Sequence, residues 1–222
     1  MRLVIFDVDG TLVDSQADIV AAMDAAFAAQ GLPAPARAAV LGIVGLSLPQ
    51  AMARLAPEAP ADVQARLVEA YKDSYMGLRA AKGPASSPLY PGARAMLDRL
   101  AGRDDLLLGV ATGKSRRGLD ALIEAHGLRG LFVTEQVADH HPSKPHPAMV
   151  LAALSETSVA AGDAVMVGDT TFDMDMARAA GVAGIGVAWG YHPARSLTAA
   201  RTVIRDFEAL PDAMAQVWAG DR

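Results

Sequence analysis

The sequence of 222 residues contains no cysteine. This absence excludes a disulfide framework, a zinc site built from thiolates and a cysteine nucleophile. Positive charge is not in excess either, because 20 Lys and Arg residues stand against 25 Asp and Glu residues and give a net charge of −5. Without a general positive field, binding to nucleic acid or to anionic lipid is disfavoured as a function.

Long hydrophobic runs are also missing. The longest apolar stretches, among them 106–111 and 164–168, have the length of a strand and fall far short of the about 20 residues that cross a bilayer. The apolar run before Asp7 is shorter than the core of a secretory signal, which spans about 7–15 residues. We therefore expect a cytoplasmic protein with neither a membrane nor a nucleic-acid partner.

Short apolar runs recur along the chain and alternate with segments of helical periodicity. The strand-like runs are 3–6, 106–111, 131–133, 165–167, 184–187 and 202–204. The helical segments between the later runs are 93–103, 116–126, 147–156 and 172–180. This alternation predicts an α/β fold with a doubly wound, Rossmann-like parallel sheet, because strands buried on both faces read as continuous apolar runs.

One long segment breaks the alternation. It has no strand pattern, and its apolar residues recur at helical spacing. Ser15 and Asp18 have the spacing of a capping box that opens a first helix, which Gly31 would end. We therefore expect a helical cap domain inserted into the core. The predicted division is 1–14 and 85–222 for the α/β core and 15–84 for the cap.

Polar side chains follow four of the expected strands. The motif DVDGT lies at 7–11, TGK at 112–114, SKP at 143–145 and GDTTFD at 168–173. Ligands of open α/β sheets bind at the carboxyl ends of the strands. We therefore expect these four loops to bring acids, a hydroxyl group and an amine to one edge of the sheet.

The acidic residues of these loops indicate a metal site. Asp7 and Asp9 are two residues apart in an extended segment, so their side chains share a face. With Asp169 and Asp173 converging on them, all four carboxylates cannot ionise unless a cation offsets their repulsion. Mg²⁺ prefers carboxylates, carbonyls, water and phosphate oxygens. We therefore expect Mg²⁺ as the cofactor of Asp7, Asp9, Asp169 and Asp173.

In their order and in their place at strand ends, the four motifs resemble those of the haloacid dehalogenase-like (HAD) hydrolase superfamily, and the helical insert resembles the small cap of that family. The resemblance implies that the metal takes the side chains of Asp7 and Asp169 and the backbone carbonyl of Asp9, with Asp173 orienting or supplementing them. Asp7 would attack phosphorus and form an aspartyl-phosphate, and Asp9 would be the acid-base.

The remaining motif residues receive roles from the same resemblance. Thr112 and the amides of Gly113 and Lys114 would bind phosphoryl oxygens, and Lys144 would supply a fixed positive charge. The stretches 89–92 and 187–191 look like those of the phosphoglycolate phosphatase group within the superfamily. The resemblance therefore implies a phosphatase for a small phosphorylated metabolite, with 2-phosphoglycolate as the leading substrate.

One segment of the cap is a candidate for binding the part of the substrate beyond the phosphoryl group. Residues 42–47 form a turn with two glycines that precedes a helix, for which Ser47 is the expected N-cap. Exposed amides at such a helix start attract anions. We therefore expect Gly45 and Ser47 to contact a substrate carboxylate, although a plain turn between two cap helices explains the pattern equally well.

Several alternatives use the same loops. A β-phosphoglucomutase-like phosphotransferase would differ only in its cap, and pyrophosphate or a sugar phosphate would be other substrates. A dehalogenase is disfavoured because Asp9 supplies the acid-base that phosphoryl transfer needs. Two alternatives are not enzymes: a sensor that binds a phosphorylated metabolite without turnover, and a receiver-like module, whose phosphorylated Asp should follow the third strand.

Overall fold

The computed structural model describes residues 1–220. Within this range one sheet of six parallel strands has the order β3-β2-β1-β4-β5-β6. The strands are β1 Arg2–Phe6, β2 Leu106–Thr112, β3 Thr134–Val137, β4 Ala164–Gly168, β5 Ala183–Val187 and β6 Thr202–Ile204. The chain starts in the middle of the sheet and winds outward in both directions, so the predicted fold class is confirmed.

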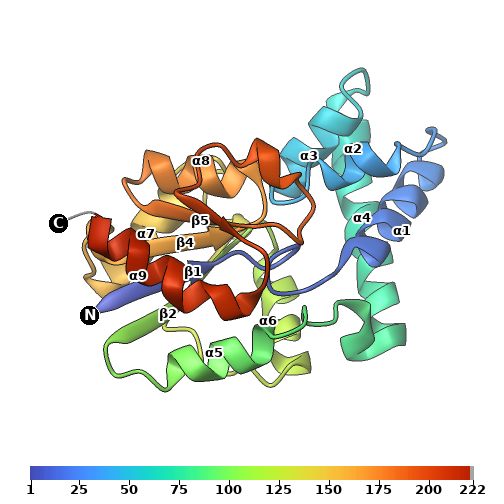
Figure 1. The fold of residues 1–222 in the computed structure, drawn as a ribbon. Coiled ribbons are helices and arrows are strands. Elements are labelled where there is room, and N and C mark those ends of the chain that lie inside the picture. The colour runs from blue at the N-terminus through green and yellow to red at the C-terminus, as the bar shows by residue number, and fades with distance from the viewer. Residues whose placement is uncertain (221–222) are drawn as a thin grey trace.

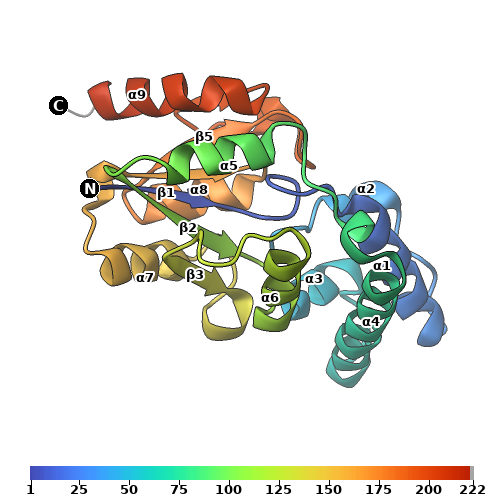
Figure 2. The same ribbon diagram turned by 90° about the horizontal axis from the view of Figure 1, so that it is seen from below.

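Helices cover both faces of this sheet (Figures 1 and 2). The helices α5 Ala93–Ala101, α6 Arg116–Ala125 and α9 Leu210–Gly220 pack on one face, and α7 Ala148–Thr157 and α8 Thr171–Ala179 on the other. Along β1, Val4 and Phe6 enter the first core and Leu3 and Ile5 the second, all four with no exposed surface. This double burial explains the continuous apolar run of the central strand.

The cap consists of four helices with an apolar core of their own. They are α1 Gln16–Ala29, α2 Arg37–Leu41, α3 Leu48–Leu55 and α4 Ala61–Lys82. Both views place them beyond the carboxyl ends of the strands, opposite the N-terminus (Figures 1 and 2). In the part of the chain that the structure describes, no helix combines the length and apolarity of a membrane span.

Short 3₁₀ helices complete the connections. They are η1 Gly83–Ser86, η2 Ala138–His140, η3 Ala161–Asp163, η4 Ala194–Ser196 and η5 Phe207–Ala209. The first of them carries the chain from α4 back to the core. The proposed boundaries at 14/15 and 84/85 stay a prediction, although α1 and α4 begin and end close to them.

The expected third strand at 131–133 is wrong. The strand lies at 134–137, while Val133 is 55% exposed and belongs to the connection that leads into it. Because β3 is at the edge of the sheet, its buried positions include the polar pair Thr134 and Gln136, which bond to each other and to Glu156. Asp139 follows this strand at the sheet edge and accepts a hydrogen bond from the backbone N–H of Arg116.

The expected capping box at the start of α1 is also wrong. Ser15 is the N-cap residue, but its hydroxyl donates to Asp9. Asp18 is buried and accepts hydrogen bonds from Lys82 and from Ser86. The side chain of Asp18 thus joins segments that are distant in sequence, while that of Ser15 bonds to the loop before the helix and does not cap it. The predicted stop is confirmed, because Gly31, with φ +66°, directly follows the C-cap of α1.

Candidate active site

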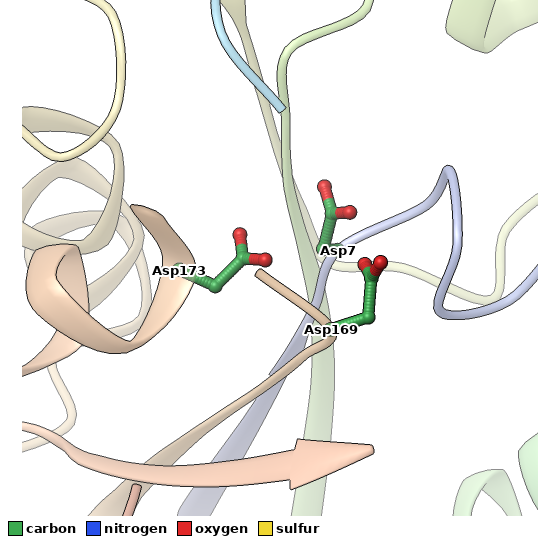
Figure 3. Close-up of side chains that lie close together, drawn as sticks. All are labelled: Asp7, Asp169 and Asp173. Carbon is green, nitrogen blue, oxygen red and sulfur yellow. The ribbon is translucent and has the colours of Figure 1, made fainter. Parts of the chain in front are cut away.

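Three buried carboxylates meet at the carboxyl edge of the sheet. Asp7 directly follows β1, Asp169 directly follows β4 and Asp173 lies in the first turn of α8. Because β1 and β4 are neighbours, their ends bring the acids together. One carboxylate oxygen of each residue lies within 4.8 Å of the others, and Figure 3 shows the three side chains pointing toward one another. None of the three is more than 1% exposed.

Lys144 is the cation that already faces these acids. Its Nζ lies 2.6 Å from Oδ1 of Asp7 and 2.6 Å from Oδ1 of Asp173, and its side chain has no exposed surface. Burial by itself would lower the pKa of Lys144, but the charges of Asp173 and Asp7 raise it above the ordinary value. The amine therefore stays charged and offsets part of the negative charge.

One positive charge does not balance three carboxylates. Burial raises the pKa of Asp7 to about 7, with Lys144 opposing and Asp173 adding to the rise. Burial and the charge of Asp7 also raise the pKa of Asp169 well above its ordinary value. Oδ2 of Asp7 is buried and has no hydrogen-bond partner within residues 1–220. An unsatisfied buried oxygen among three acids fits a hard, oxygen-binding cation such as Mg²⁺.

The acids are fixed by their immediate neighbours. Asp173 forms a capping box with Thr170, whose backbone N–H and hydroxyl both donate to Oδ2 of Asp173. Asp169 accepts hydrogen bonds from the hydroxyl of Thr11 and from the backbone N–H of Tyr191. Gly10 has φ +88°, and a Cβ there would lie 2.3 Å from Oδ2 of Asp169, so only glycine fits in the DVDGT loop.

Asp9 has different surroundings from the other three acids. Its Oδ1 lies 2.9 Å from Nζ of Lys114 and also accepts from the hydroxyl of Ser15. The side chain of Asp9 is thus outside the group of three carboxylates within the described chain. Its expected part in metal binding, through the backbone carbonyl, stays a prediction.

The sequence did not identify Ser15 and Tyr191 as site residues, although they lie beside Asp9. The backbone N–H of Ser15 donates to the hydroxyl of Tyr191 at 2.9 Å, and the two hydroxyl oxygens are 3.1 Å apart. Through its own backbone N–H, Tyr191 also bonds to Asp169 at 2.7 Å. A chain of hydrogen bonds therefore runs from Asp9 through Ser15 and Tyr191 to Asp169. No local pattern connects residues that lie 176 positions apart.

The second motif lies beside these acids. Thr112 is buried, and its Oγ1 accepts the backbone N–H of Lys114 at 3.2 Å. Its hydroxyl proton thus remains available for a ligand oxygen. The ammonium group of Lys114 faces Asp9 and also donates to the hydroxyl of Tyr75 in the cap at 3.3 Å.

The cap turn touches the core where the second motif ends. A Cβ on Gly113 would lie 2.7 Å from the carbonyl oxygen of Gly45, so the two backbones meet closely. Ser47 is the N-cap of α3 as predicted, and its backbone N–H donates to Oγ of Ser143 at 2.8 Å. In this arrangement the amide of Ser47 already has a partner from the core.

A cavity of about 310 Å³ lies between the cap and these loops. The core lines it with Asp7, Asp9, Thr112, Gly113 and Lys114, whereas the cap contributes Gly45 and mostly apolar residues of all its longer helices. The cavity thus brings together Asp7, Asp9 and the phosphoryl-binding candidates of the second motif. Lys144 and Ser47 do not line it.

Comparison with known proteins finds sequences and structures that are similar to this chain over most of its length. A family model described as "Haloacid dehalogenase-like hydrolase" matches residues 4–187. "Probable phosphatase IndB" of Dickeya dadantii is 39% identical over 89% of this chain and 86% of its own length. "Phosphoglycolate phosphatase" of Rhodospirillum rubrum is 34% identical over 95% and 90%. A crystal structure of a hydrolase from Pseudomonas syringae, 26% identical, superposes with a TM-score of 0.85 over 97% of this chain and 99% of that one.

Proposed function

The chain belongs to the haloacid dehalogenase-like hydrolase family, and we propose that it hydrolyses a small phosphomonoester in a Mg²⁺-dependent reaction through an aspartyl-phosphate on Asp7. Relatives named as phosphatases cover most of the chain, so the enzyme is a phosphoric monoester hydrolase. The observation that best supports the proposal is the environment of Asp7, which combines Lys144, two further acids and a buried oxygen without a hydrogen-bond partner among residues 1–220.

The side chains of Asp7, Asp169 and Asp173 and the carbonyl of Asp9 are the groups we expect to hold Mg²⁺. Bound there, the ion would neutralise the acids and polarise a phosphoryl oxygen. It would also favour the ionised form of Asp7, which is the form that attacks, because a nearby positive charge lowers the pKa of a carboxyl group.

The reaction we propose has two steps. A carboxylate oxygen of Asp7 attacks phosphorus, and the bond from phosphorus to the alcohol oxygen breaks while Asp9 donates its proton to that oxygen. Asp9 then takes a proton from a water molecule, whose oxygen attacks the same phosphorus. This second attack breaks the bond to Asp7 and releases inorganic phosphate. Asp9 regains its proton and Asp7 its carboxylate, so the cycle closes.

Other residues position the phosphoryl group. The hydroxyl of Thr112 and the N–H of Gly113 are the donors we expect at the phosphoryl group, because both residues line the cavity, and Lys144 holds Asp7 at 2.6 Å. Such fixed donors act on charge that develops during transfer, and this kind of positioning dominates phosphoryl-transfer catalysis. Lys114, whose Nζ lies 2.9 Å from Oδ1 of Asp9, is placed to hold Asp9 between the two steps.

The substrate predicted from the sequence is 2-phosphoglycolate, which matches the names of several relatives. The cap turn at 42–47 supports this substrate less than the sequence predicts. The Ser47 amide that would receive the carboxylate bonds to Ser143 instead, and only Gly45 of the pair lines the cavity. 2-Phosphoglycolate is therefore the reference substrate against which others are measured.

The proposal is tested by phosphate release from 2-phosphoglycolate and 4-nitrophenyl phosphate. We expect activity to vanish in chelator and to return with Mg²⁺. Asp7→Asn should abolish turnover, and Asp9→Asn should slow it by about 10²–10⁴-fold, the usual contribution of an acid-base group. Asp175→Asn changes a carboxyl group on α8 that pairs with Arg178, and it should retain activity.

Turnover by Asp7→Asn at the wild-type rate would contradict the nucleophile, and full activity in chelator would contradict the metal. Binding of phosphorylated compounds without release of phosphate from any of them would instead identify a sensor.

A further inference from the structure

The wall of the cavity is polar at the core and largely apolar at the cap. At the core end lie Asp7, Asp9 and Thr112, the groups proposed to act on the phosphoryl group. The cap side is largely hydrocarbon, and its apolar members come from three helices and the turn before α3. They are Ile19, Met23, Ile43, Val44, Leu46, Leu48, Ala51 and Met76. A phosphate held by the core would therefore direct its alcohol part toward an apolar surface.

The charged residues of the lining leave the cap side of the cavity largely apolar. Lys114 is paired with Asp9, and Lys72 is paired with Glu69 at 2.7 Å. The Lys72 and Glu69 side chains are 43% and 68% exposed, so this pair lies in contact with water. Asp73, Arg79 and Arg117 also keep contact with solvent. The two arginines attract any phosphorylated molecule, whatever its alcohol part.

Aromatic side chains add to the apolar wall. Tyr71 and Tyr75 lie one helical turn apart on α4 and stack with their ring centroids 5.8 Å apart. Both line the cavity, and Nζ of Lys114 lies 5.0 Å from the centre of the Tyr75 ring. The aromatic pair thus extends from the ion pair of Asp9 along the cap. A flat or flexible hydrocarbon group could pack against these rings without loss of any hydrogen bond.

The size of the cavity exceeds what a two-carbon alcohol requires. Pockets of about 300 Å³ and larger are those that enclose drug-sized ligands. Glycolate would place a second carboxylate two carbons from the phosphate and leave most of the apolar wall against water. Burial of that wall by substrate is favourable by an amount proportional to the area covered.

We infer that the preferred substrate is the phosphomonoester of an apolar alcohol larger than glycolate, with an alkyl or arylalkyl group that fills the cap side of the cavity. This inference rests on the proposed function, since the phosphoryl group must lie at Asp7. It differs from that function in assigning the choice of substrate to hydrocarbon contacts with Met76, Leu48 and their neighbours.

The experiment is a series of primary n-alkyl phosphates from ethyl to hexyl phosphate, with 2-phenylethyl phosphate and 2-phosphoglycolate measured alongside. The alcohols of the series have similar acidity, so the chemical step changes little along it. We expect kcat/KM to rise about fourfold for each added methylene until the cavity is full. Hexyl and 2-phenylethyl phosphate should both exceed 2-phosphoglycolate.

Two variants on one helix test the wall itself. Met76→Gln keeps the length of the side chain but places an amide in the lining, and it should lower kcat/KM for hexyl phosphate about fivefold or more while ethyl phosphate changes little. Leu78→Gln is the matched control, because Leu78 is on α4 but does not line the cavity. It should leave the ratio of hexyl to ethyl phosphate as in the wild type.

The outcomes separate this inference from the function on which it rests. Release of phosphate from every ester with no gain from ethyl to hexyl would overturn the apolar alcohol and leave the phosphatase intact. The same holds if 2-phosphoglycolate exceeds hexyl phosphate, or if Met76→Gln and Leu78→Gln change the ratio equally. Failure with all esters, including 4-nitrophenyl phosphate, would overturn the proposed function itself.

Discussion

Removal of divalent cations should make the stability of this protein fall as pH rises. Burial raises the pKa of Asp7 from 3.8 to about 7, so the folded state keeps a proton that the unfolded chain has already released. A raised carboxyl pKa contributes stability that is fully present below the unfolded value and lost as pH rises through the folded value. The window for Asp7 therefore runs from about pH 4 to about pH 7.

The size of the effect follows from the same two values. A shift of about three pH units corresponds to about 4 kcal/mol of unfolding free energy, of which about 3 kcal/mol falls between pH 5 and pH 8. The raised pKa of Asp169 acts in the same direction. Mg²⁺ at the site should remove most of this dependence, because it stabilises the ionised acids in the folded state.

Urea unfolding at pH 5, 6, 7 and 8, in chelator and in Mg²⁺, measures this dependence. Carboxyl groups elsewhere titrate as well, and the pKa of Asp62 and of Asp105 is lowered by hydrogen bonds to arginine. The difference between wild type and Asp7→Asn isolates the site, and Asp175→Asn serves as the control. In chelator, wild type should lose stability relative to Asp7→Asn as pH rises. A difference that stays constant from pH 5 to pH 8, or that Mg²⁺ does not change, would refute the reasoning.

Two further substitutions test the groups around the acids. Tyr191→Phe removes the hydroxyl bonded to Ser15 but keeps the backbone bond to Asp169, so kcat for alkyl phosphates should fall about 2–10-fold, as expected for one hydrogen bond. The Mg²⁺ dependence and the rate with 4-nitrophenyl phosphate should change much less, because the leaving group of this ester needs little help from an acid. Equal losses with alkyl phosphates and 4-nitrophenyl phosphate would contradict a role of Tyr191 through Asp9. Lys144→Met leaves two buried carboxylates without their cation, so the free energy of unfolding, measured by heat or urea without Mg²⁺, should fall by about 3–5 kcal/mol. A fall of less than about 1 kcal/mol would contradict the buried pairing.

The sequence predicts the centre of this molecule better than its edges. The strands β1, β2 and β4 are covered on both faces, and their continuous apolar runs reveal them. Each is followed directly by a motif, so the meeting of Asp7 with Asp169 could be foreseen from parallel topology alone. The edge strand β3 has buried polar residues held by Glu156, and no apolar run marks it.

Side-chain partners that lie far away in sequence explain the errors at the cap. Ser15 and Asp18 fit a local capping pattern, yet Asp18 bonds to Lys82 and Ser86, which are more than 60 residues away. A buried carboxylate gains more from a cation than from an exposed helix end, so the tertiary contact prevails. For the same reason only the family resemblance, and not the local pattern, gave Asp9 a role different from that of the other acids, since its distinct environment depends on Lys114.

The segment from Asp7 to Ser15 joins three functions within nine residues. It begins with the proposed nucleophile Asp7, continues through the proposed acid-base Asp9 and ends at the first residue of the crossing into the cap. Because the Ser15 hydroxyl bonds to Asp9 whereas Asp7 is held by Lys144, we expect a change in the direction of the chain at this crossing to affect Asp9 more directly than Asp7. Tyr191 fastens the crossing to the loop that holds Asp169. We therefore expect the proposed acid-base Asp9 to be more sensitive to the position of the cap than the proposed nucleophile Asp7.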